Sequence, residues 1–214
     1  MPLLPYCMVE EGPAISAPAH GVQSASVETI SVPGLRAFYS QMESLVSDAA
    51  TLKQSALEFH NVVSSLFQQT TVLPFRFPTL LADIEELASH LMANAELYRQ
   101  DLKRLRGMAQ MEVRITTGAG EVNVASGTEY LRSRRARQAA LRSMALEVRT
   151  QSQHLLSDWR ERETKNGWRC YALINTSAAN KFEEMVRCLN APAGVQFGVS
   201  GPWPPTEFIS QPNQ

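Results

Sequence analysis

The spacing of apolar and polar residues predicts that strands and helices interleave along the whole chain. Residues 26–32 alternate and are rich in β-branched side chains, whereas residues 46–68 repeat apolar side chains every three or four positions along one helical stripe. The pair Pro33-Gly34 favours a turn, so the strands on either side of it should form a hairpin. In the first half the pattern predicts strands 3–9, 26–32, 35–39 and 71–77, and helices 46–68 and 83–106.

The second half shows the same interleaving. The run Ser126-Gly127-Thr128-Glu129 has the spacing of a capping box and predicts the start of a long helix that continues to about residue 160. Three nearby prolines, which lack a backbone N–H, should end the last strand at residue 200. The elements expected here are strand 111–116, helix 126–160, strand 168–175, helix 178–189 and strand 195–200.

This order predicts an α+β fold of two small domains, with the helices on one face of each sheet. The expected domains are residues 1–108 and residues 109–214, the second of which includes the Pro-rich tail. Charge supports a division, because residues 1–100 carry ten acidic and four basic side chains, whereas residues 101–214 carry eleven acidic and sixteen basic ones.

Composition is that of an ordinary globular chain, with 44% apolar residues, 19% charged residues and a formal net charge of −1. Three cysteines in 214 residues do not suit a disulfide-stapled secreted scaffold. The first residues lack a basic segment, and no stretch approaches the roughly 20 apolar residues that cross a bilayer. We therefore expect a soluble, reduced, cytoplasmic protein without membrane insertion.

Candidate catalytic and metal-binding groups are scattered. The histidines lack the spacing that places two ligands on one helical face, and Gly118-Ala119-Gly120 lacks the third glycine of a dinucleotide fingerprint. The pairs Glu85-Glu86 and Glu183-Glu184 diverge by about 100° on a helix, so neither converges on one substrate atom. We expect no enzyme activity, no metal and no cofactor. The four histidines are His20, His60, His90 and His154.

A cluster of arginines near the start of the long helix leaves two interpretations open. It could bind RNA or an acidic partner, or it could be an exposed helix face. Tyr130 alone lies near it as an aromatic that could stack on a base, and the arginines circle the helix, which favours the exposed face. The cluster comprises Arg132, Arg134, Arg135, Arg137, Arg142 and Arg149.

Four segments resemble, in the same order, segments of the gas vesicle GvpF/GvpL family. They are VLPFRFPT at 72–79, GMAQMEV at 107–113, SGTEYL at 126–131 and SGPWPPTEF at 200–208. The resemblance spans residues 3–209, and GPWPP is an unusual pentapeptide. Two departures are Pro78, where the family usually has Gly, and Thr206-Glu207, where it commonly has Tyr-Ser.

This resemblance implies a non-enzymatic accessory protein of gas vesicle formation, located in the cytoplasm and associated with vesicles. The expected partners are the GvpA-type shell protein, whose nucleation or assembly it would assist, and other gas vesicle accessory proteins, with no nucleic acid. It also implies a modified ferredoxin-like fold for the second domain. The motif positions, which could be structural or bind a partner, are Pro74, Arg76, Phe77, Gly107, Glu112, Tyr130, Gly201, Pro202, Trp203, Pro204 and Pro205.

Alternatives remain for both the motifs and the function. Trp203 could cover part of a core or anchor a partner, and Arg76 could reach a partner carboxylate or satisfy a helix C-terminus. The chain could also be a family member used as a scaffold or assembly factor outside gas vesicles. A less favoured alternative is an RNA-binding module that uses the Arg132–Arg149 helix.

Overall fold

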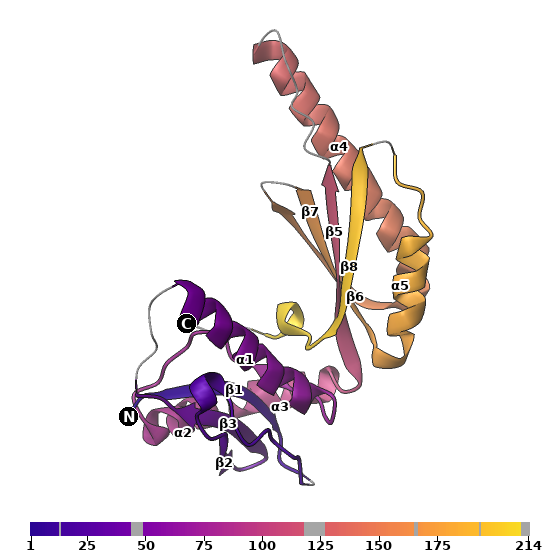
Figure 1. The fold of residues 1–214 in the computed structure, drawn as a ribbon. Coiled ribbons are helices and arrows are strands. Elements are labelled where there is room, and N and C mark those ends of the chain that lie inside the picture. Colours follow the sequence, from indigo (N-terminus) through magenta and orange to yellow (C-terminus); the bar gives the residue numbers. More distant parts are fainter. Residues whose placement is uncertain (13, 44–48, 118–126, 165–166, 193, 211–214) are drawn as a thin grey trace. The chain divides into compact units, whose positions relative to one another are not determined.

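A computed structural model describes residues 1–12, 14–43, 49–117, 127–164, 167–192 and 194–210 (Figure 1). The chain forms two compact units, residues 1–107 with 204–214, and residues 108–203. The sequence predicts that residues 204–214 belong to the second domain, whereas residues 204–210 group with the first unit. The second unit is therefore inserted between two segments of the first.

The first unit is built around a four-stranded antiparallel sheet in the order β2-β3-β1-β4. The predicted hairpin is present, and its turn contains Gly34 at a φ of +79°, a conformation that favours glycine. The elements are β1 (Leu3–Glu10), β2 (Glu28–Val32), β3 (Leu35–Gln41), α1 (Ala49–Phe67), β4 (Leu73–Pro74), α2 (Ile84–Ala93) and α3 (Ala95–Arg104), with short 3-10 turns at Val22–Ser24 and Thr206–Phe208.

Both faces of this sheet are covered, so the prediction of helices on one face is wrong for the first unit. Helix α1 contributes Phe59 to a core that includes Leu4 and Phe38. Neighbouring residues on the same strands, such as Leu3 and Ala37, point to the opposite face and are also buried. Helices α2 and α3 contact β1, β2 and β4 and cover that second face.

Two other elements of the first unit differ from the prediction. The helix expected over residues 83–106 is divided at Asn94, which has a φ of −112° and a ψ of 10°. The Asn94 side chain donates a hydrogen bond to the carbonyl of His90, one of the local contacts by which asparagine competes with the helix. The strand expected over residues 71–77 retains only two paired residues, because the chain turns away from the sheet after Pro74.

The second unit has the order βαββαβ, and its four strands lie antiparallel in the order β6-β7-β5-β8. This is the ferredoxin-like arrangement, so the expected fold class is confirmed. Its elements are β5 (Met108–Thr117), α4 (Gly127–Ser152), β6 (Leu156–Thr164), β7 (Gly167–Asn175), α5 (Ala179–Arg187) and β8 (Val195–Trp203), with 3-10 turns at Gln153–Leu155 and Thr176–Ala178.

The prediction of one helix from residue 126 to residue 160 is wrong at its end. Helix α4 ends at Ser152, whose hydroxyl donates to the carbonyl of Val148 at 2.7 Å. Residues 156–164 form β6, an edge strand paired with β7. Five of its nine residues are charged, which suits a solvated edge but hides the alternation that marks a strand in the sequence.

Strand β8 extends three residues beyond its predicted end, through Gly201-Pro202-Trp203. Proline is compatible with this position because β8 is an edge strand. Gly201 has a φ of +131°, and an added Cβ would lie 2.7 Å from the sulfur of Met111. A register shift in the β5–β8 pairing lies beside this glycine.

Helices α4 and α5 pack on one face of the second sheet. They bury Leu141, Val148 and Phe182 against alternate residues of β5 and β7, such as Val113 and Ala172. None of the helices in the described ranges combines the length and apolar character of a bilayer-spanning segment.

Candidate functional site

A small groove in the first unit is the candidate site. Its cavity volume is about 260 Å³, below the roughly 300–1,000 Å³ of small-molecule sites, so it suits one or two side chains. The walls are largely apolar and come from β1, β4, the segment after β4, both helices α2 and α3, and the C-terminal segment. The lining residues are Met8, Leu73, Pro74, Phe75, Arg76, Thr79, Leu81, His90, Tyr98, Ile209 and Ser210.

Local backbone bonds explain how the motif segment reaches this groove. Leu73 and Pro74 pair with β1, and the N–H of Phe75 donates to the carbonyl of Tyr6 at 2.9 Å. The chain then leaves the sheet in a turn in which the Thr79 N–H donates to the Arg76 carbonyl at 2.8 Å. It returns at Leu81, which exchanges backbone hydrogen bonds with Leu3. Residues 76–80 therefore form a turn between two points at which the chain bonds to β1.

An aromatic series lines one wall. The ring centroids of Phe75 and His90 are 5.9 Å apart, and those of His90 and Tyr98 are 6.0 Å apart. The Tyr98 hydroxyl and the His90 Nε2 atom share a hydrogen bond of 2.7 Å. Burial lowers the pKa of His90 against an opposing effect of Glu86, and burial raises the pKa of Tyr98 to about 12. Both groups are therefore neutral at pH 7, and the wall is uncharged.

Arg76 is the permanently charged side chain among the described residues that line the groove. It is exposed, and no acidic side chain in the described ranges pairs with its guanidinium group. A partner that places an apolar side chain in the groove could therefore bring a carboxylate to Arg76. Arginine binds a carboxylate through two parallel hydrogen bonds, which adds orientation to affinity.

The C-terminal segment is held to the first unit by a buried carboxylate. Asp101 on α3 is 2% exposed. Its Oδ2 atom accepts a hydrogen bond from the Ser210 N–H at 2.7 Å, and its Oδ1 atom accepts from the Ser210 hydroxyl at 3.0 Å and from Arg104 at 2.7 Å. Arg104 also donates to the carbonyl of Phe208, which is fully buried. These bonds hold residues 208–210 beside the groove.

The structure distributes the predicted motif positions over both units. Pro74 and Arg76 line the groove, whereas Phe77 packs into the core with its ring centroid 5.3 Å from that of Phe59. Gly107 has a φ of +70° just after α3, which explains a glycine there. The remaining first-unit positions, Pro204 and Pro205, are buried.

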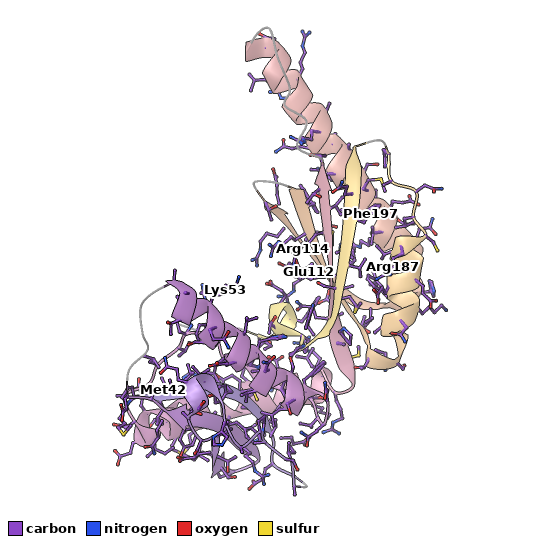
Figure 2. All side chains as sticks on the ribbon, in the orientation of Figure 1. Met42, Lys53, Glu112, Arg114, Arg187 and Phe197 are labelled. Atoms are coloured by element: carbon purple, nitrogen blue, oxygen red, sulfur yellow. The ribbon has the colours of Figure 1, made fainter. Side chains whose placement is uncertain are left out.

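The other motif positions belong to the second unit. Trp203 is half-buried at the end of β8 and pairs with Gln110, and Gly201 and Pro202 precede it in that edge strand. Glu112 is 13% exposed and accepts a hydrogen bond from Arg114 at 2.8 Å. Figure 2 shows Glu112 and Arg114 together on β5. The Tyr130 side chain lies outside the described residues.

A second pocket, of about 810 Å³, lies between α4 and β6 in the second unit. Arg142 and Arg149 from the predicted arginine cluster line it together with Trp159 and Glu161. The Glu161 carboxylate accepts hydrogen bonds from the indole N–H groups of Trp159 at 2.7 Å and Trp168 at 3.0 Å. An aromatic neighbour for the arginines therefore comes from Trp159 of β6, a residue that lies inside the helix predicted to continue to about residue 160.

Several site residues had no signal in the sequence. His90, Tyr98 and Ile209 reach the groove only through the break at Asn94 and the return of the tail.

In the described ranges, no group of three or more histidine, cysteine or acidic side chains could hold a metal ion. Burial raises the thiol pKa of Cys7 and of Cys170, so neither is a ready nucleophile.

These features define a two-unit α+β protein whose candidate site is an apolar groove suited to binding side chains. Residues 3–210 match the family described as "Gas vesicle synthesis protein GvpL/GvpF", and the chain belongs to that family. Membership supports a gas vesicle-related role. Comparison with curated proteins finds no match.

Two crystal structures share the fold over nearly the full length. The gas vesicle protein GvpF from Anabaena sp. PCC7120 superposes with a TM-score of 0.79 at 14% identity, covering 99% of this chain and 97% of that one. GvpF from Microcystis aeruginosa gives a TM-score of 0.75 at 13% identity, covering 98% of this chain and 99% of that one.

Proposed function

We propose that this chain is a non-enzymatic accessory protein of gas vesicle formation that binds the GvpA-type shell protein in the cytoplasm and assists its nucleation or assembly. Family membership supports the process. The observation that carries the binding role is the apolar groove beside Arg76, whose guanidinium group has no acidic partner in the described ranges.

The groove holds an apolar side chain of the shell protein while Arg76 pairs with a nearby carboxylate. Such contacts cover apolar surface that would otherwise lead shell subunits to associate before they join a growing vesicle. The same contacts can be released without covalent chemistry.

Side-chain docking fits this site better than the addition of a strand. Leu73 and Phe75 lie on either side of Pro74, and the Phe75 N–H points toward β1. Successive residues of a strand direct their backbone groups to opposite sides, so the outer edge falls at Pro74, which has no N–H to donate. Proline at an open edge protects it from pairing with another strand.

The test is co-expression of the chain with the GvpA-type shell protein from the same genome, followed by a pull-down. Retention of soluble shell protein at high salt would support binding of its apolar surface by this chain. The variant Arg76→Glu should reduce retention about tenfold or more, because it places a like charge against the partner carboxylate. The matched control Lys53→Glu also replaces a positive charge by a negative one, on the exposed surface of α1, where Figure 2 labels Lys53. This control should leave retention unchanged.

Equal retention of both variants would refute the assignment to this groove. No retention of the wild-type chain would refute shell binding and favour the alternative of a scaffold or assembly factor outside gas vesicles.

The pocket of Arg142, Arg149 and Trp159 favours RNA binding as a second candidate, but the Glu161 carboxylate in the same pocket would repel a phosphate. Salt-sensitive binding to RNA that Arg149→Glu abolishes would support that candidate.

A further inference from the structure

The two edges of the second sheet differ sharply in charge. Edge strand β6 carries five charged residues among nine, the usual protection against pairing with another chain. Edge strand β8, with the sequence VQFGVSGPW, carries none. It is also nine residues long, and Gln196 and Gly198 are exposed. An uncharged edge of this length is a template for pairing with a further strand.

Backbone geometry identifies which groups of β8 are open. The N–H of Val195 donates to the carbonyl of Pro192 at 3.0 Å, so Val195 directs its backbone groups away from β5. Residues two apart on a strand direct their N–H and C=O groups to the same side. Phe197 and Val199 therefore present two N–H and two C=O groups at the open edge, whereas Gln196, Gly198 and Ser200 face β5.

The open groups are self-complementary about Gly198. When a second β8 lies antiparallel with Gly198 opposite the partner's Gly198, Phe197 faces the partner's Val199, and the partner's Phe197 faces Val199. Each of these pairs exchanges two backbone hydrogen bonds and places an aromatic ring beside a β-branched side chain, a favourable cross-strand combination. The overlap covers residues 195–201 and stops before Pro202, which has no N–H to offer.

We propose that β8 pairs with β8 of a second copy of this chain, joining two four-stranded sheets into one of eight strands. The contact is isologous, so it closes as a two-fold dimer and does not propagate. Pairing of β8 with β6 of another copy would place the charged residues of β6 beside an apolar edge and is disfavoured. The proposal is independent of the shell-binding function, because it uses no residue of the groove.

The contact is narrow, so the dimer is weak and depends on concentration. A weak dimer carries two grooves, which raises the retention of a partner that presents the same segment repeatedly. Figure 2 labels Phe197 on β8, with Arg114 on the neighbouring strand β5.

The test uses the full chain and charge changes at Gly198. An added Cβ there would meet its nearest atom, the Cβ of Arg114, at 3.9 Å, so a side chain fits. The two-fold axis places residue 198 opposite itself, so Gly198→Lys or Gly198→Glu alone sets like charges against each other. Sedimentation should show each variant's dissociation constant raised roughly fivefold or more. A mixture of the two variants should associate again, through opposite charges, as measured by energy transfer between labelled chains.

Gly12→Lys is the matched control, since its added Cβ also meets its nearest atom at 3.9 Å on an exposed surface of the first unit. It should dimerise like the wild-type chain, and thermal unfolding verifies that every variant is folded. The proposal is overturned by a wild-type chain that stays monomeric up to millimolar concentration. It is also overturned by a dimer that both Gly198 variants leave unchanged, or by a mixture that associates no better than the single variants.

Discussion

Loss of the Asp101 carboxylate should release the C-terminal segment from the first unit. The change Asp101→Ala removes two hydrogen bonds from Ser210 to a buried charged acceptor, at 2.7 and 3.0 Å. Bonds to a charged group contribute about 1.5–3 kcal/mol each. The third partner, Arg104, is 45% exposed, so its ion pair contributes less than a buried one. Because the released tail regains conformational freedom, the net loss should be about 2–4 kcal/mol.

Urea and thermal unfolding of the full chain measure this loss, and it should lower the Tm of the first unit by about 10 °C. Limited proteolysis should also cut near Phe208 faster in the variant, since release of the tail exposes that buried side chain. Glu96→Ala on the same helix is the control, because Glu96 is exposed and its ion pair with Arg99 is 3.4 Å long. A loss for Asp101→Ala within about 0.5 kcal/mol of that control would refute the reasoning.

Three further predictions concern single residues. Gly201→Ala should destabilise the second unit by about 2–4 kcal/mol in urea unfolding, whereas Gly198→Ala on the same strand should change stability by less than about 1 kcal/mol; equal losses would contradict the steric argument. Because burial lowers the pKa of His90, the unfolded state binds the proton at a higher pH than the folded state does. The contribution of neutral His90 to the free energy of unfolding is therefore complete above about pH 6.5 and is lost as pH falls through the folded pKa. The urea midpoint of the wild-type chain should therefore fall more between about pH 8 and about pH 5 than that of His90→Gln, which keeps an acceptor for Tyr98; parallel slopes would exclude His90 as the source. A maleimide should label one of the three cysteines in the native chain, the exposed Cys188, and all three after unfolding; native labelling of either buried thiol would show that its strand opens.

Much of the fold could be predicted because its elements carry strong local signals. The hairpin around Gly34 and helix α1 each combine a clear period with a suitable turn or stripe. The element order predicted for the second half lacks one strand of a ferredoxin-like unit, because residues 156–160, the first part of β6, are predicted as the end of the preceding helix. The charged residues of this edge strand face solvent and do not alternate with buried apolar residues. The spacing of apolar residues therefore cannot distinguish the strand from an exposed helix.

Only some of the residues that line the candidate site could be predicted from the sequence. Pro74 and Arg76 stood out through the family resemblance, and they do line the groove. His90 and Tyr98 were not identified, because their positions depend on the helix break at Asn94. A single asparagine in a helical pattern is not enough to predict such a break. Ile209 and Ser210 depend on the bonds of Asp101, a contact more than a hundred residues distant in the chain. Long-range packing of this kind leaves no mark on local composition.

The return of residues 204–210 to the first unit has a consequence for synthesis on the ribosome. The first unit cannot complete its core until Phe208 has left the exit tunnel, after the whole inserted unit has been made. The inserted unit has all its strands in one continuous stretch and can fold first, although it comes second in the gene. A gene fragment that stops near residue 108 would therefore yield an incomplete first unit, and a circular permutant in which a linker joins residues 204–210 to Met1 would restore the missing segment.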